Sequence, residues 1–119
     1  MRENIIISKS EDFAVRIVTL SKILMTERNE YIMSKQLIRC GTSVGANIAE
    51  AQEAQSAIDF IAKLYISLKE CSETKYWLKL LHRTKYLSEN EYKSINSDAS
   101  ELKALLTAII KTKKENLRT

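Results

Sequence analysis

Apolar residues recur at intervals of three or four along this chain, the spacing that places them on one side of an α-helix. Three serines each precede an acidic residue by three positions, a pattern typical of the first turn of a helix: Ser8 with Glu11, Ser56 with Asp59, and Ser88 with Glu91. These starts predict helices over about 8–28, 56–84 and from 88 to about 110. A further helical pattern covers about 34–54.

The short connections between these four segments favour antiparallel neighbours, and hence an all-α, up-down-up-down four-helix bundle. The 119 residues contain no proline and two glycines, and no linker or repeat divides them. We therefore expect a single domain over 1–119. A short N-terminal extension (1–8) precedes its first helix, and a basic tail (111–119) follows its last.

Both glycines of the chain fall in the second predicted helix, where turns are not expected. Gly41, Gly45 and Ala49 are spaced four apart and share one side of that helix. Small residues at this spacing let another backbone approach closely, and each glycine costs a helix about 1 kcal/mol relative to alanine. We expect a close packing contact here, shared with a neighbouring subunit of a homo-oligomer.

A row of polar residues occupies another side of the same helix: Arg39, Ser43, Asn47 and Glu50. On the third predicted helix, Glu70 and Glu73 share a sector with Ile66 and Trp77. Because a buried carboxylate needs a partner, we interpret the six polar residues as a structural network that links the two helices through Arg39. If it is buried, replacing Arg39 with alanine costs about 3–5 kcal/mol.

The sequence offers little for catalysis. It contains no nucleophile elbow, phosphate loop, dinucleotide fingerprint or zinc spacing, and His82, its one histidine, is expected at the surface or at a helix edge. Cys40 and Cys71 are read as buried free thiols. With no signal-peptide core and no membrane-length apolar run, we expect a cytoplasmic protein that is not an enzyme and holds no metal or cofactor.

Positive charge gathers in two places. The chain has 19 Lys and Arg against 15 Asp and Glu, and the whole excess of +4 lies after Leu102. One arc of the third predicted helix is free of acids and interleaves cations with Tyr65 and Tyr76. Positive charge with tyrosines suits phosphate contact and base stacking, although long cations also solvate ordinary helices. The candidate nucleic-acid contacts are Lys69, Lys75, Lys79, Arg83, Lys85, Lys111, Lys113 and Lys114.

Two segments together resemble a known family: "KQLIRCGTSVGANIAEA" and "DFIAKLYISLKECSETKYWLKLL". They are similar to the four-helix-bundle proteins encoded within intervening sequences of bacterial 23S rRNA genes, over about residues 10–110. The shared residues include Arg39, Ser43, Asn47, Glu50 and Glu70, with Glu73 and Trp77 following. The family usually has glycine after its Asn-Ile-Ala-Glu, and this chain has Ala51 there.

The resemblance implies a small cytoplasmic bacterial protein that assembles as a homopentamer around a central channel. It also implies kinship with the accessory variability protein of diversity-generating retroelements, a basic pentamer that binds nucleic acid and a reverse transcriptase. For the family at large it implies no established activity.

Two functions stay open at this point. In the first, a non-enzymatic homo-oligomer binds RNA or DNA through the basic arc and the tail. In the second, the bundle is a scaffold or accessory subunit for another protein, such as a reverse transcriptase. The charge balance of residues 1–102 favours the second, because many dedicated nucleic-acid binders are more basic overall.

Overall fold

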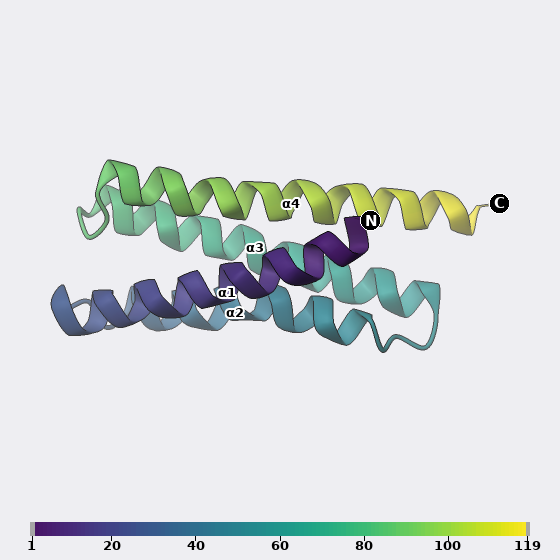
Figure 1. Cartoon of the computed structure of the whole chain (residues 1–119), viewed down its shortest axis with the longest axis horizontal. Helices are drawn as coiled ribbons and strands as arrows, with labels where there is room; N and C mark the ends of the chain where they lie inside the picture. The colour runs from purple at the N-terminus through teal and green to yellow at the C-terminus, as the bar shows by residue number, and fades with distance from the viewer. Residues whose placement is uncertain (1, 119) are drawn as a thin grey trace.

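Four α-helices make up the part of the chain that the computed structural model describes, residues 2–118, with side chains described from Asn4 onward. They are α1 (Arg2–Glu27), α2 (Met33–Ala51), α3 (Ala57–Arg83) and α4 (Glu89–Leu117). Successive helices run antiparallel in an elongated bundle of 52 × 22 × 19 Å (Figure 1). Each helix packs against its neighbours in sequence, and α1 also packs against α4. The predicted four-helix bundle is therefore present.

The start of α1 differs from the prediction. The helix begins at Arg2, so residues 2–8 of the expected extension are helical, and Met1 lies outside the described residues. Ser8 is not a cap, since its hydroxyl donates to the carbonyl of Ile5 at 3.1 Å. Ile6 is only 2% exposed and continues the buried stripe of Phe13 and Ile17. Burial of this extra turn explains why the helix continues past the capping pattern.

An acidic residue that the sequence did not single out holds the start of α2. The Glu30 carboxylate accepts from the backbone N–H groups of Ile32, Met33 and Ser34, at 3.2, 3.0 and 2.7 Å. The Ser34 hydroxyl in turn donates to the Glu30 carbonyl at 2.8 Å. A carboxylate here satisfies N–H groups that lack partners in the first turn and complements the helix dipole. Glu30 is accordingly buried.

The predicted starts of α3 and α4 are confirmed. The Ser56 hydroxyl accepts from the Asp59 N–H at 3.0 Å. Ser88 forms a complete capping box with Glu91, in which each side chain accepts from the other residue's backbone N–H, at 3.1 and 2.9 Å. At the other end, α4 continues to Leu117, so most of the predicted basic tail is helix.

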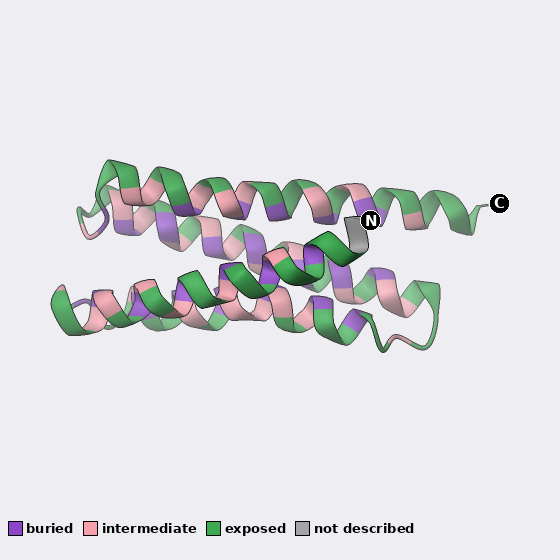
Figure 2. Cartoon of the chain, in the orientation of Figure 1, coloured by how far each residue is buried: buried purple, intermediate pink, exposed green. Residues whose placement is uncertain are grey.

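The core lies along the inner sides of the four helices, where Figure 2 shows the buried positions. Leu37 and Val44 of α2 meet Leu64 and Leu78 of α3 in one buried cluster, all at most 1% exposed. The buried Ser67 hydroxyl joins these helices by donating to the Val44 carbonyl at 2.7 Å. This pairing satisfies a polar group that would be costly to bury alone.

The two glycines of α2 face α1 of the same chain. A side-chain carbon at Gly41 would lie 2.8 Å from Cγ2 of Ile17, and one at Gly45 would lie 3.3 Å from the backbone carbonyl oxygen of Ser10. The predicted close approach is therefore real, but its partner is α1. Ala49, the third member of the row, is exposed. Packing against α1 accounts for both glycines. The contact with a neighbouring subunit that was predicted at the glycines is therefore not required to explain them.

We expect Gly41→Ala to lower the free energy of unfolding by about 1–2 kcal/mol, since overpacking outweighs the helix propensity that alanine adds. Ile17 is fully buried and cannot move aside without disturbing the core. Urea unfolding followed by circular dichroism measures the effect. Gly45→Ala is the matched control and should change stability less. An unchanged or raised stability for Gly41→Ala would contradict the close contact.

Arg28 and Glu91 connect the end of α1 to the start of α4. Arg28 donates to both carboxylate oxygens of Glu91, at 3.0 and 2.7 Å, and to the Tyr86 carbonyl at 2.7 Å. The hydrogen bonds from Arg28, followed by that from the Ser88 backbone, lower the pKa of Glu91 from 4.5 to about 2. The pair therefore stabilises the fold in full above pH 4.5 and loses that contribution as the pH falls towards 2.

Glu91→Gln should lower the free energy of unfolding at pH 7 by about 1–2 kcal/mol, a value kept small because solvent screens a partly exposed pair. The Glu91 side chain is 39% exposed. Denaturant titrations at several pH values should show the difference between wild type and variant shrinking between pH 4.5 and 2. A difference that stays constant over this range would contradict the assigned pairing.

Candidate nucleic-acid interface

The acidic residues in the middle of α3 face α2. Arg39 of α2 pairs with Glu73 and, at 3.4 Å, with Glu70. The Trp77 indole N–H donates to the same Glu73 carboxylate at 3.0 Å. Asp59 lies in the first turn of α3, near the start of the helix. Because Glu70 and Glu73 are directed towards α2, their negative charge lies away from the side of α3 that meets α4.

The acidic residues in the middle of α4 face α1 in the same way. Arg16 of α1 donates to Asp98 at 2.5 Å and to the Ser94 hydroxyl at 3.1 Å. Lys9 of α1 pairs with Glu101 at 3.1 Å. Two helices thus supply cations that pair with the central acids of the other two. The side shared by α3 and α4 is left with its basic residues.

Lys75 stands at the middle of this shared side. Its ammonium donates to the Ser100 hydroxyl of α4 at 2.5 Å, so the side chain bridges the two helices. Burial raises the pKa of the Cys71 thiol to about 11, and the charges of Lys75 and Lys103 counteract part of this increase. The Cys71 thiol donates to the Ala99 carbonyl of α4 at 3.3 Å, and Lys103 follows Ala99 by one helical turn. Lys103 was not among the predicted contacts, because which side of α4 meets α3 depends on packing.

The remaining predicted cations of α3 are exposed: Lys69, Lys79 and Arg83, with Lys85 in the turn that follows. None of these four forms an ion pair with a carboxylate among residues 4–118, whose side chains the structure describes. His82 lies beside them at the helix edge, where it is bonded to Glu89 at 3.0 Å and stacked on Tyr92 at 4.5 Å between ring centroids. His82 is thus an edge residue with structural partners.

The basic residues near the end of α4 lie against the first half of α3, because the two helices are antiparallel (Figure 1). Lys114 donates to the Tyr65 hydroxyl at 3.1 Å and lies 5.6 Å from the centre of its ring. Lys113 lies 5.2 Å from the centre of the Phe60 ring. Lys111 is exposed. The predicted contacts therefore extend along the length of the α3–α4 pair.

We call this surface the basic face and use the name below. It comprises Lys69, Lys75, Lys79 and Arg83 of α3, Lys103, Lys111 and Lys114 of α4, and the exposed tyrosines Tyr65 and Tyr76. Lys85 lies at one end of it and Lys113 at the other.

The predicted polar network differs from expectation in burial and in connectivity. The Arg39 side chain is 48% exposed, so the network lies on the outer side of α2 and α3. The Ser43 hydroxyl donates to the Arg39 carbonyl and the Asn47 amide to the Ser43 carbonyl, while Glu50 pairs with Lys63 at 3.6 Å. Short polar side chains in helices commonly bond to the preceding turn in this way.

An exposed Arg–carboxylate cluster stabilises a fold by about 1 kcal/mol or less. The cost of 3–5 kcal/mol expected for a buried Arg39 therefore does not apply to the structure. Arg39 holds Glu70 and Glu73 at the α2–α3 boundary. The two carboxylates therefore lie away from the basic face, and this is how Arg39 affects the candidate site.

An apolar strip runs along the outer side of the first half of α3. Ile58 is 72% exposed and Ile66 43% exposed, with the small Ala62 between them. Further along, the rings of Tyr76 and Trp77 meet edge to face, with centroids 5.2 Å apart. We call Ile58, Ala62 and Ile66 the apolar strip.

Other kinds of site find no support in the described part of the chain. Cys40 and Cys71 are buried free thiols, and burial raises the pKa of both. No group of three or more His, Cys, Asp or Glu side chains among these residues could hold a metal ion. None of the described helices is long and apolar enough to cross a membrane.

Comparison with known proteins relates the chain to one family. Residues 2–108 match the family described as 23S rRNA-intervening sequence protein. Among solved structures, the chain is similar to a protein of unknown function from the S23 ribosomal protein family of Bacteroides thetaiotaomicron. The identity is 56% and the TM-score 0.92, over 93% of this chain and 99% of that one. Proteins with curated descriptions gave no significant match. The chain therefore belongs to the 23S rRNA-intervening sequence protein family, as its sequence motifs indicate.

Proposed function

We propose that this protein is a non-enzymatic, homo-oligomeric binding module that holds RNA or DNA on its basic face. The observation that carries the proposal is the segregation of charge within the bundle. The central acids of α3 and α4 pair with Lys9, Arg16 and Arg39 of the other two helices. The cations of the basic face keep their charge available for an external anion.

The side chains on this face suit a nucleic-acid backbone. Exposed lysines and arginines neutralise phosphates without reading the base sequence, and tyrosines offer flat surfaces on which bases stack. Tyr65 is 40% exposed and Tyr76 54% exposed. A strand laid along α3 and α4 would meet cations from both helices, with Lys75 between them. We expect one such face to bind nucleic acid with modest affinity, so that tight binding requires several copies of the face in one assembly.

Self-association is the second part of the proposal. Several copies of a weakly binding face on one assembly raise the overall affinity without any new contact. Because α1 covers the glycines of α2, the surface offered to another copy is the apolar strip. Exposed isoleucines on one side of the helix, with only the small Ala62 between them, favour association with a matching surface. The sequence resemblance supports a pentamer.

The apolar strip also supports the alternative function. A protein partner, such as a nucleic-acid enzyme for which this chain is an accessory subunit, could cover Ile58 and Ile66. In that case one partner would co-purify at a fixed ratio, with no nucleic acid on the basic face. The same lysines would then only solvate the helices.

The decisive variant reverses two charges of the basic face. Lys79→Glu with Arg83→Glu should weaken binding to a mixed single-stranded RNA pool by on the order of tenfold or more, and should reduce the salt dependence of binding, since two phosphate contacts are lost. Fluorescence anisotropy at several salt concentrations measures both. Both residues are exposed, so the fold should persist by circular dichroism.

Lys22→Glu with Lys35→Glu is the matched control, because both residues are exposed on α1 and α2, away from the basic face. Its net charge equals that of the test variant. If both double variants weakened binding equally, net charge and not the basic face would be responsible. Wild-type affinity in the test variant would overturn the assignment.

A further inference from the structure

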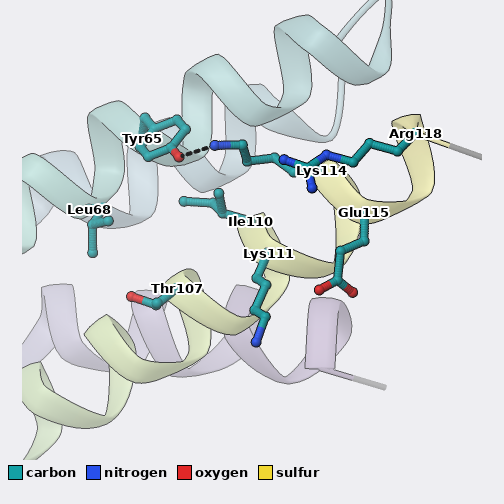
Figure 3. A pocket seen from close by; sticks show the side chains of 8 residues that line it. All are labelled: Tyr65, Leu68, Thr107, Ile110, Lys111, Lys114, Glu115 and Arg118. Carbon is teal, nitrogen blue, oxygen red and sulfur yellow. Dashed lines mark hydrogen bonds between the residues drawn. The ribbon is translucent and has the colours of Figure 1, made fainter.

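The end of the basic face contains a pocket between α3 and α4, about 360 Å³ in volume (Figure 3). Tyr65 and Leu68 of α3 form one side, and the last three turns of α4 form the other. Ile110, which is 4% exposed, lies at its apolar floor. The volume falls within the range of small-ligand sites, which is about 300–1,000 Å³.

Positive charge gathers at this end of the basic face. Lys111, Lys114 and Arg118 line the pocket, and Glu115 is the one acid among its lining residues. Figure 3 shows Lys114 reaching across to Tyr65 with Arg118 on the same side of α4, while Lys111 and Glu115 point to the other side. The lining therefore carries a net charge of about +2 at neutral pH.

We propose that this pocket binds the terminal phosphomonoester of a nucleic-acid strand that lies along the basic face. The inference rests on the proposed function and adds the part of the strand that is recognised. A terminal phosphate carries a charge of about −1.5 to −2 at neutral pH, whereas each internal phosphodiester carries −1. Lys114 and Arg118 together supply two positive charges, which match the first, whereas a single cation of the basic face matches the second.

The apolar part of the pocket suits the nucleotide attached to that phosphate. Tyr65 is 40% exposed, and its hydroxyl is held by Lys114 at 3.1 Å, so the ring has a defined position. Leu68 and Ile110 extend the apolar surface beside it. A base that stacks on this surface would place its phosphate beside Lys114 and Arg118. Charge and stacking would then act on one terminal nucleotide.

The cations of this pocket also lie outside the segment that defines the family. The family match ends at residue 108, whereas Lys111, Lys114 and Arg118 all follow it. Their arrangement depends on the continuation of α4 to Leu117 along α3. The family match therefore does not extend to these cations, and the proposal is made for this chain.

The test uses one single-stranded RNA sequence in three forms: with a 5′-phosphate, with a 3′-phosphate, and with hydroxyl groups at both ends. Anisotropy of an internal label reports affinity of the full chain for each. We expect at least one phosphorylated form to bind on the order of tenfold more tightly than the hydroxyl form, the effect of one or two charge-assisted hydrogen bonds. Which end is preferred identifies the polarity of the strand.

Arg118→Gln should strongly reduce this preference and leave binding of the hydroxyl form nearly unchanged, because Arg118 lines the pocket but is not part of the basic face. Lys22→Gln, the charge-matched control, should retain the preference. Tyr65→Phe keeps the ring but removes the hydroxyl that contacts Lys114. This variant should keep most of the preference for a phosphorylated end, because its ring still offers a surface on which the base stacks. Equal affinity of wild type for all three RNA forms would overturn the pocket while leaving the proposed function intact. Absence of binding to any form would overturn both.

Discussion

Gly41 allows α1 to pack against α2 with Ile17 in the space that a side chain would otherwise occupy. This contact places α1 beside α4 as well, where Arg16 and Lys9, on the same helix as Ile17, reach Asp98 and Glu101. Energetically these ion pairs are modest, because their side chains are partly exposed. They mark an orientation of α4 in which Asp98 and Glu101 face α1 while Lys114 contacts Tyr65 of α3.

The α2–α3 boundary repeats this arrangement, with Arg39 against Glu70 and Glu73. The central acids of α3 and α4 thus face cations of α1 and α2. The surface shared by α3 and α4 is therefore basic, although residues 1–102 contain equal numbers of acidic and basic residues. The net charge of the chain therefore does not indicate that this basic surface exists. The distribution of charge over the helices favours a phosphate-bearing partner, which the composition alone does not indicate.

Local signals explain what could be predicted from the sequence. Ser56 and Ser88 begin helices because each cap involves residues three positions apart. Ser8 carries the same signal inside a helix, where the burial of Ile6 overrides it. The exposure of Arg39 and the positions of Lys103 and Arg118 depend on how whole helices pack, and helical spacing alone does not contain that information. The partner of the glycines, α1, is likewise a result of packing.

The measurement that tests the central claim most directly is size-exclusion chromatography with light scattering of protein taken from a lysate without nuclease treatment. Absorbance at 260 and 280 nm is recorded at low and then at high salt. The account predicts an oligomer that carries nucleic acid at low salt and releases it as salt rises, because phosphate contacts release counterions. An oligomer free of nucleic acid at low salt, or a monomer that binds none, would contradict it.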